Sequence, residues 1–307
     1  MSRIAAVLVT RNAAATLDLA LRSVRPWVDE VVVVDMHSDD TTRAVAEAHG
    51  ARVLLHDRVG YADPARAFAV ASATCPWVIM IDADEVVPPS VATVLLAVAA
   101  GDEADAVLLP WRNHMLGAVA AHGPFAATRD RHIRFFKPWA LVLSSSPHRK
   151  PELHPDARLL RLPVDDAHSV EHYAHRDMSD LLQRADRYTD LQAREDARTG
   201  QVPSSGAAVR SAVRQFASGY LRHGGYRGGW RGLHLSLFMA AYELVRQGKG
   251  AQLLEVGDAA TVAADYRRLA EVVLSGYEAG GFDAVPAASS EVPVGQVRRS
   301  GDEEVGP

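Results

Sequence analysis

The chain has 307 residues, of which 48% are hydrophobic and 23% are charged, so it can bury the core of a large α/β domain with an extension. Its formal net charge of −5 argues against a general nucleic-acid-binding protein, because non-specific affinity for phosphate backbones requires a basic face. A single cysteine, Cys75, excludes an intrachain disulfide and a cysteine-based zinc finger. No signal-peptide pattern and no apolar run of roughly 18 residues is present in the sequence, which predicts a cytoplasmic protein.

Strand-like and helix-like patterns alternate through the first hundred residues. Strands are predicted at 4–9, 30–34, 53–55, 77–82 and 106–109, and helices at 16–24, 39–49, 64–73 and 89–100. Asp39 or Asp40 is expected to cap the second helix. This alternation predicts a parallel, doubly wound sheet with right-handed connections. Three acids, Asp35, Asp57 and Asp82, follow predicted strands and should therefore meet at one edge of the sheet.

The pattern becomes less regular after Trp111. Residues 131–137 are predicted to form an edge strand that Pro138 ends. A mainly helical region is predicted from about Met178 to Gln247, and the residues from about Ala279 have the composition of a disordered tail. The predicted organisation is a catalytic domain at 1–165, a helical region at 166–278 and a tail at 279–307.

Two carboxylates follow the most apolar predicted strand. The run from Trp77 to Ile81 ends at Asp82 and Asp84, which are one residue apart. Open α/β sheets bind ligands at the carboxyl ends of their strands. Mg²⁺ and Mn²⁺ are usually held by one or two protein carboxylates, while substrate phosphates and water complete the coordination. Helix capping would explain one acid but not two, so the pair predicts a divalent-cation site that receives a diphosphate.

Several motifs occur in an order and spacing that resemble a known family. After three of the predicted strands come Thr10-Arg11-Asn12, Val34-Asp35-Met36-His37-Ser38-Asp39-Asp40-Thr41 and Ile81-Asp82-Ala83-Asp84-Glu85. Farther along the chain come Asp130 to Phe136, His172-Tyr173, Arg187-Tyr188 and Gln215 to Gly232. Over residues 3–248 the chain resembles glycosyltransferase family 2, and within it the branch that includes lipopolysaccharide-core glucosyltransferases.

The resemblance implies a GT-A fold, which is a Rossmann-like, mostly parallel sheet flanked by helices, here with a C-terminal helical extension. It also implies inverting transfer of a sugar from a nucleotide-diphosphate donor, with a UDP-sugar favoured, and Mg²⁺ or Mn²⁺ as cofactor. The implied acceptor is a hydroxyl of a glycan, a lipid-linked molecule or a small molecule, in cell-envelope or natural-product glycosylation.

The resemblance also assigns roles to residues of this chain. The implied metal ligands are Asp84, Asp82 and His148. The implied nucleotide pocket consists of Thr10, Asn12, Asp35, Arg66 and Asp82. Asp130 is the implied catalytic base, which would take the proton of the acceptor hydroxyl.

Two departures from the family pattern leave a non-catalytic alternative open. The family usually has acids after the position of Asn12, where this chain has three alanines, and His148 is followed by Arg149 rather than by Glu. A partner protein with a decayed acceptor site would bind donor and metal without transfer. Residues 82–86 also fit the Asp-x-Asp-x-Val signature of haloacid-dehalogenase-type phosphatases. Those enzymes carry the signature on their first strand, whereas three β-α units precede it here.

Two clusters in the second half have alternative interpretations. His168, His172 and His175 would share one face if their segment were helical, and such a face could bind zinc; a surface cluster is the alternative. Residues 220–247 join a basic, glycine-broken stretch to an apolar helix. Such a helix could lie in a membrane interface, at the inner face of the membrane, or pack on the catalytic domain.

Overall fold

The computed structural model describes residues 2–58, 63–143 and 151–279. The chain divides into two compact units, residues 1–253 and 254–307. Among the described residues, the first unit contains the strands, the helices α1 to α6 and nearly all of α7 (Gly229–Glu255), and the second consists mainly of helix α8 (Ala259–Ala279). Within the described ranges, no helix is both long enough and apolar enough to cross a membrane. The domain boundaries expected at 165 and 278 stay predictions, and the expected tail lies outside the described residues.

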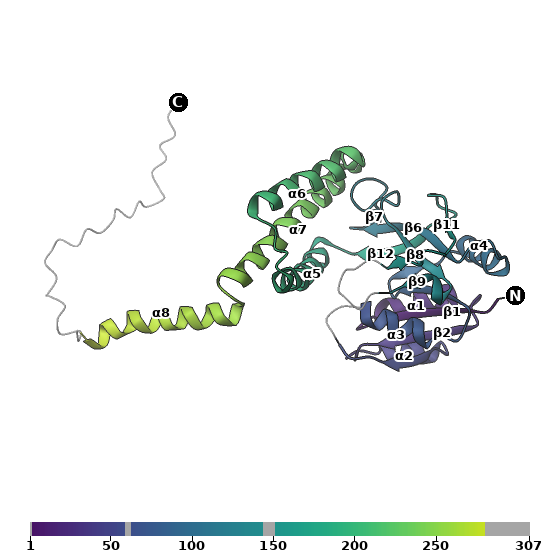
Figure 1. Ribbon diagram of the computed structural model, residues 1–307, viewed down its shortest axis with the longest axis horizontal. Coiled ribbons are helices and arrows are strands. Elements are labelled where there is room, and N and C mark those ends of the chain that lie inside the picture. The colour runs from purple at the N-terminus through teal and green to yellow at the C-terminus, as the bar shows by residue number, and fades with distance from the viewer. Residues whose placement is uncertain (1, 59–62, 144–150, 280–307) are drawn as a thin grey trace, which may run out of the picture. The chain divides into compact units, whose positions relative to one another are not determined.

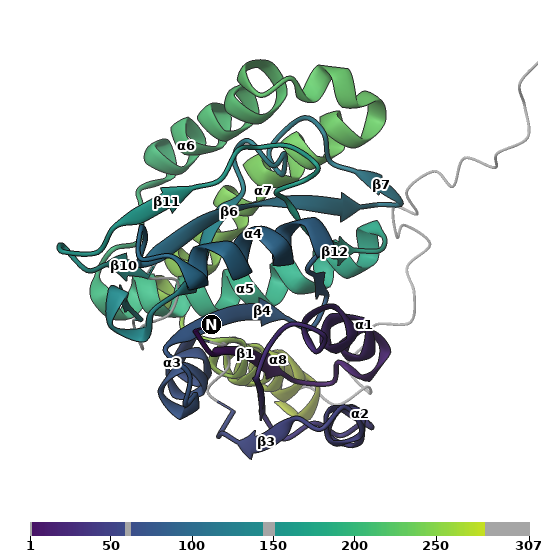
Figure 2. The ribbon, with the colours of Figure 1, turned by 90° about the vertical axis from the view of Figure 1, so that its right-hand side faces the viewer.

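A ten-stranded sheet forms the centre of the first unit (Figures 1 and 2). Its order is β3-β2-β1-β4-β8-β6-β12-β5, and β7 and β11 also pair with β6. The strands are β1 (Ile4–Thr10), β2 (Glu30–Asp35), β3 (Arg52–Leu55), β4 (Trp77–Asp82), β5 (Glu85–Val86), β6 (Ala106–Met115), β7 (Ala118–Val119), β8 (Arg131–Phe136), β11 (Leu159–Arg161) and β12 (Val170–His175). A separate pair consists of β9 (Leu141–Val142) and β10 (Glu152–Leu153).

The sheet is mostly parallel. Strands β1 to β4 run parallel to one another, as do β6, β11 and β12, while β8 is antiparallel to both of its neighbours. The expected α/β fold, with helices flanking the sheet and a helical extension, is confirmed. The expectation of an edge strand at 131–137 is wrong, because β8 lies inside the sheet between β4 and β6. Its Arg134 is buried against acidic side chains, so a charged residue there does not mark a solvent-facing strand.

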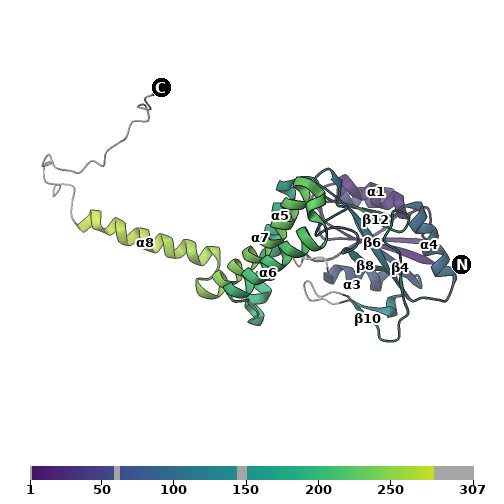
Figure 3. The same cartoon turned by 90° about the horizontal axis from the view of Figure 1, so that it is seen from above.

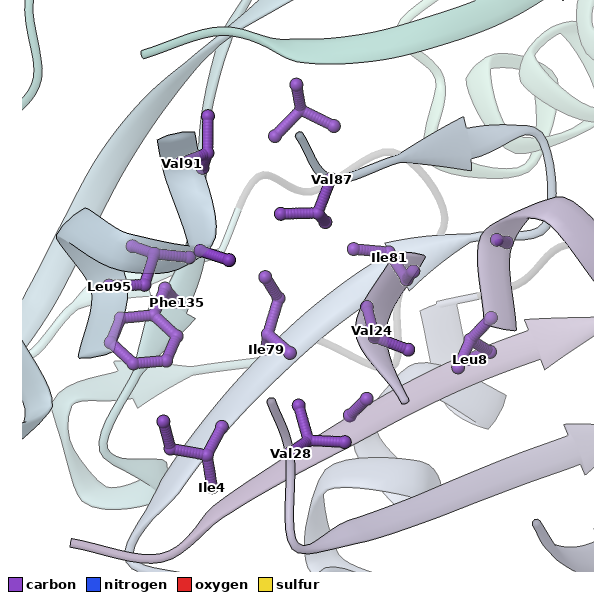
Figure 4. Close-up of a cluster of buried hydrophobic side chains, with 14 of the residues drawn as sticks. Ile4, Leu8, Val24, Val28, Ile79, Ile81, Val87, Val91, Leu95 and Phe135 are labelled. Carbon is purple, nitrogen blue, oxygen red and sulfur yellow. The ribbon is translucent and has the colours of Figure 1, made fainter. Parts of the chain in front are cut away.

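Helices cover both faces of the sheet because alternate residues of a strand point to opposite sides. On one face, Ile4 and Leu8 of β1 pack with residues of α1 (Ala14–Val24) and α4 (Pro89–Ala100) (Figure 4). On the other face, Ala5 and Val7 pack with residues of α3 (Asp63–Ser72). The core therefore fixes β1 and β4 from both sides.

The helix α2 (Thr42–Ala48) is shorter than expected, since it starts three residues after Asp39. Asp40, rather than Asp39, satisfies nearby backbone donors. Its carboxylate accepts from Thr42 N at 3.0 Å and from Ala14 N, in the first turn of α1, at 3.2 Å. One side chain thus ties together the starts of two helices.

The helical extension lies beside the sheet (Figures 1 and 3). It contains α5 (Met178–Thr199), α6 (Ser205–Ala217) and α7 (Gly229–Glu255), with a π-helical turn (Ser218–Arg222) and a 3-10 helix (Gly225–Gly228) before α7. Asp177 caps α5 by accepting from Asp180 N at 2.8 Å, and Gly200 ends it in the left-handed conformation. Residues 200–204 separate α5 from α6, and the glycine-broken stretch expected before the apolar helix contains the breaks before α7.

Candidate active site

A polar cleft of about 670 Å³ lies at the carboxyl ends of β1 and β4. Five of the residues expected at the metal and nucleotide line this cleft: Thr10, Asn12, Arg66, Asp82 and Asp84. Arg11 and Thr16 line it too, and the strand β12 and the helix α5 supply the other polar side chains, namely His172, His175, Asp180, Gln183, Arg184, Arg187 and Tyr188. A second cleft of about 610 Å³, between α1 and α4, is lined mainly by apolar side chains. The first cleft is therefore where polar chemistry can occur.

Asp82 is held by two guanidinium groups. Arg66 Nη2 donates to both carboxylate oxygens, at 2.8 and 2.9 Å, and Arg134 Nη2 donates to one of them at 3.1 Å. Burial opposes ionisation, but Arg66 and Arg134 outweigh it and hold the pKa of Asp82 well below its usual range. Asp82 is thus an anion that arginines already neutralise, and its roles at metal and nucleotide stay predictions.

Glu85 supports Asp82 from inside the protein. Its carboxylate accepts from Asp82 N at 2.9 Å and from the Trp111 indole at 2.7 Å. Burial, together with the charge of Asp82, raises the pKa of Glu85. Glu85 therefore fixes the turn that presents Asp82 and Asp84 to the cleft.

Asp84 and His172 face each other across the cleft. Asp84 Oδ1 is 3.7 Å from His172 Nε2, and Asp84 Oδ2 is 3.4 Å from Arg184 Nη1. His172 Nδ1 is 2.6 Å from Asn113 Oδ1. Because an amide oxygen only accepts, His172 carries a proton on Nδ1, and its Nε2 faces Asp84.

The orientation of the Asn113 amide is fixed by its other contacts. Asn113 Nδ2 donates to Phe125 O at 2.9 Å and to Asp130 Oδ2 at 2.6 Å, so its oxygen must face His172. A carboxylate oxygen and an imidazole nitrogen that face one another suit a divalent cation. The described residues hold no cluster of three or more such ligands, which fits a cation whose remaining ligands are phosphates and water. His148, an expected ligand, lies outside the described residues.

Asp130 does not line the cleft but is joined to it through Asn113. Its second oxygen lies 2.6 Å from His132 Nε2. Burial would raise the pKa of Asp130, but the hydrogen bonds from His132 and Asn113 hold it below the usual value. Asp130 is therefore ionised at neutral pH, as a base must be. Its role as catalytic base stays a prediction.

The loop after β1 is held by the residues that follow β2. Asn12 has a positive φ of 51°, its N donates to Ser38 Oγ at 2.9 Å, and its Oδ1 accepts from Asp39 N at 2.8 Å. Asp35 is fully buried, accepts from Ser38 N at 2.9 Å and is absent from the cleft lining. The structure thus shows Asp35 holding the loop, and its expected nucleotide contact stays a prediction. The buried Thr10 hydroxyl has no hydrogen-bond partner within the described part of the chain.

Asp57 does not converge on the cleft as expected from its place after a strand. Its carboxylate is exposed and lies 3.7 Å from His37 Nε2. The segment with His168, His172 and His175 is not helical, because His172 and His175 belong to the strand β12 and His168 precedes it. These three residues therefore do not share a helical face.

Comparison with known proteins identifies the sheet domain. Residues 5–148 match the family described as Glycosyl transferase family 2. An uncharacterized glycosyltransferase from Rickettsia felis (strain ATCC VR-1525 / URRWXCal2) is 28% identical over 219 residues, which cover 67% of this chain and 74% of that protein. Residues 5–148 form a glycosyltransferase family 2 domain. The expected enzyme class, a glycosyltransferase, is confirmed, and the haloacid-dehalogenase alternative is not supported.

Two solved structures are similar to parts of this chain. Mannosyltransferase PcManGT from Pyrobaculum calidifontis, in complex with GDP-Man and Mn²⁺, has 15% identity and a TM-score of 0.47, covering 81% of this chain and 87% of that one. Glucosyl-3-phosphoglycerate synthase from Mycobacterium tuberculosis, in complex with Mn²⁺, UDP and phosphoglyceric acid, has 28% identity and a TM-score of 0.31. That match covers 38% of this chain and 44% of that enzyme, which is less than half of its length.

Sequence reasoning did not place His172 beside Asp84 in the cleft. His172 was singled out in a His-Tyr motif and in a histidine cluster considered for zinc, and the metal ligand beside the aspartates was expected at His148 instead. Arg184 was not singled out. Helical periodicity could have found it, because Asp180, Arg184 and Tyr188 are one turn apart on α5 and all line the cleft.

Replacing Asn113 with leucine should weaken Mn²⁺ binding to the family 2 domain by about 10- to 100-fold, as for other residues that orient a metal ligand. The leucine removes the acceptor that keeps the His172 proton on Nδ1. Calorimetric titration of Mn²⁺ in the presence of a bound nucleoside diphosphate measures the effect. Unchanged Mn²⁺ affinity in Asn113→Leu would show that the tautomer of His172 does not matter.

Proposed function

We propose that this chain is a metal-dependent, inverting glycosyltransferase that moves a sugar from a nucleotide-diphosphate donor to an acceptor hydroxyl. The observation that carries the proposal is the Asp84–His172 pair, whose carboxylate Oδ1 and imidazole Nε2 face each other at 3.7 Å in a cleft that four arginines also line. The donor that we favour is a UDP-sugar. The acceptor is a hydroxyl of a glycan, a lipid-linked molecule or a small molecule. The transfer would serve cell-envelope glycosylation, as in the lipopolysaccharide-core branch, or natural-product glycosylation, and would take place on the cytoplasmic side.

The side chains of the cleft divide the work of such a transfer. Asp84 and His172 would hold Mg²⁺ or Mn²⁺, which when bound supplies a Lewis acid that neutralises the charge of the leaving diphosphate. Arg184 and Arg187, on the α5 wall of the cleft, are placed to donate to diphosphate oxygens. Arg184 is 3.4 Å from Asp84, so it lies beside the proposed cation site.

The nucleotide and the acceptor would be bound by other residues. Thr10 offers a buried hydroxyl without a partner among the described residues, which suits a hydrogen bond to the nucleotide. Asn12 lies beside it in a loop that Ser38 and Asp39 hold in place. Asp130 is ionised and accepts a hydrogen bond from Asn113, which also contacts His172. We propose it as the group that takes the proton of the acceptor hydroxyl in a single displacement.

Calorimetric binding of UDP, GDP and dTDP, with and without Mn²⁺, tests this function. We expect one nucleotide to bind in a metal-dependent way and His172→Ala to abolish that dependence. The matched control is His114→Ala, because His114 lies on the neighbouring strand, pairs with Glu171 at 2.6 Å and does not line the cleft.

Two outcomes would contradict the proposal. If the folded protein binds none of the three nucleotides, the donor site does not exist as described. If it binds a nucleotide sugar with Mn²⁺ but neither hydrolyses nor transfers the sugar to any acceptor class, the protein is the non-catalytic partner that the sequence left open.

A further inference from the structure

A cationic and apolar surface covers the connection from α6 to α7. Residues 199–242 contain five arginines and no aspartate or glutamate, although the whole chain has 38 acidic residues and a net charge of −5. At the average frequency of the chain, this stretch would hold about five acids. We call the exposed arginines and large apolar side chains of residues 209–230 the α6–α7 surface; they are Val209, Arg210, Val213, Arg214, Leu221, Arg222, Tyr226, Arg227 and Trp230.

Large apolar side chains project from the α6–α7 surface between the arginines. Val213 is 63% exposed, Leu221 62% and Trp230 52%. Val209 and Val213 are one helical turn apart, as are their neighbours Arg210 and Arg214, so an apolar row and a basic row run side by side along α6. Such side chains are costly to leave in water, and their alignment on one helix indicates a partner with an apolar layer.

The turn that carries this surface is tightly packed and therefore preformed. A Cβ on Gly232 would lie 1.8 Å from Gly225 O, and a Cβ on Gly225 would lie 2.8 Å from Gly219 O, so only glycines allow the two segments to approach this closely. The Phe216 and Tyr220 rings stack at 5.3 Å behind the turn. The exposed side chains are thus presented by an ordered backbone.

Two hydrogen bonds join this turn to the loops that follow β6 and β7. Gly123 N donates to His223 O at 2.9 Å, and Arg231 Nε donates to Leu116 O at 2.9 Å. The α6–α7 surface therefore has a fixed place on the same unit as the cleft, and a partner that binds it would hold the whole sheet domain.

We propose that the α6–α7 surface binds the head-group layer of a membrane that contains anionic phospholipids. Arginines would meet the phosphate and other anionic groups, while Leu221, Tyr226 and Trp230 would enter the boundary with the acyl chains, where aromatic side chains are enriched. The exposed valines and Leu221 favour a lipid layer over a nucleic acid, because nucleic acids use aromatic rings for stacking but offer little to aliphatic side chains. The proposal depends on no residue of the cleft.

Co-sedimentation of the full chain with vesicles tests this proposal. We expect binding to vesicles of phosphatidylcholine mixed with phosphatidylglycerol, weak binding to phosphatidylcholine alone, and a decrease in binding as salt is raised. Replacing Leu221 with serine and Arg222 with glutamate together should reduce binding to the anionic vesicles at least tenfold. The matched control carries the same two exchanges on β11, Leu160→Ser with Arg161→Glu, and should bind as the unchanged protein does.

Three results would overturn the proposal: equal binding to both kinds of vesicle, no binding to either, or equal losses in the test and control variants. Binding to single-stranded DNA but not to anionic vesicles would assign the surface to nucleic acid instead. The nucleotide titration separates this proposal from the proposed function, because the surface variant should bind the nucleoside diphosphate with unchanged affinity. Circular dichroism of both variants confirms that each is folded.

Discussion

Replacing Asp84 with alanine should lower kcat for sugar transfer by about a thousandfold or more, since a Lewis-acid cation stabilises several kcal/mol of charge in such a transition state. Asp84 is the carboxylate that faces His172 Nε2 in the cleft. The other carboxylate of the motif, Asp82, is already bound by Arg66 and Arg134 and cannot simply replace it. Initial-rate kinetics over a series of Mn²⁺ concentrations measure the effect.

The fold should survive this change, because the structural contact of this residue is made by its backbone. Tyr173 N donates to Asp84 O at 2.9 Å, and that bond remains in the alanine variant. The matched control is Asp57→Ala, another acid that follows a strand but is exposed and outside the cleft. Its kcat should be unchanged. If the Asp84→Ala variant has the turnover of the wild type and the same dependence on Mn²⁺, Asp84 does not bind the cation.

Local sequence patterns were sufficient for the fold of the first hundred residues. The strands β1, β2 and β4 are apolar runs that are buried on both faces, so neighbouring residues alone determine the element. The strand β8 shows where this fails. Arg134 reads as a solvent-facing residue, but it is buried because Asp82 and Glu85, about fifty positions away in the sequence, supply the opposite charge. Pairing over that distance leaves no local signal.

The same distinction separates the parts of the site that could be predicted from those that could not. Asp82 and Asp84 were predictable, because the carboxyl ends of parallel strands always meet at one edge. The role of His172 was not, since it depends on the amide of Asn113, which lies on another strand and is fixed in turn by Asp130. Asp35 follows its strand as expected, but its carboxylate accepts a hydrogen bond from Ser38 N in the loop that follows.

Replacing Arg134 with methionine should lower the free energy of unfolding at neutral pH by about 3 kcal/mol, because removing one partner leaves a buried charge without compensation. Arg134 is 9% exposed, donates to Asp82 at 3.1 Å and lies 3.8 Å from Glu85. Denaturant unfolding followed by circular dichroism measures the change. Arg131→Met is the matched control, since Arg131 begins the same strand but is exposed, and it should change the stability little.

The pH dependence of this loss distinguishes lost charge pairing from lost packing. Arg134 helps to hold the pKa of Asp82 below its unfolded value, so the stability that it supplies is fully present above an unfolded pKa of about 4. That stability is lost as the pH falls through the folded pKa. Removing Arg134 raises the folded pKa values of both Asp82 and Glu85, since it lowers each of them in the native protein. The difference between variant and wild type should therefore be largest at neutral pH and shrink as the pH falls through the raised folded pKa values of the variant. A difference that stays constant with pH would show that Arg134 stabilises the sheet by packing against Trp111, whose ring lies 5.7 Å from its guanidinium carbon, rather than by its charge.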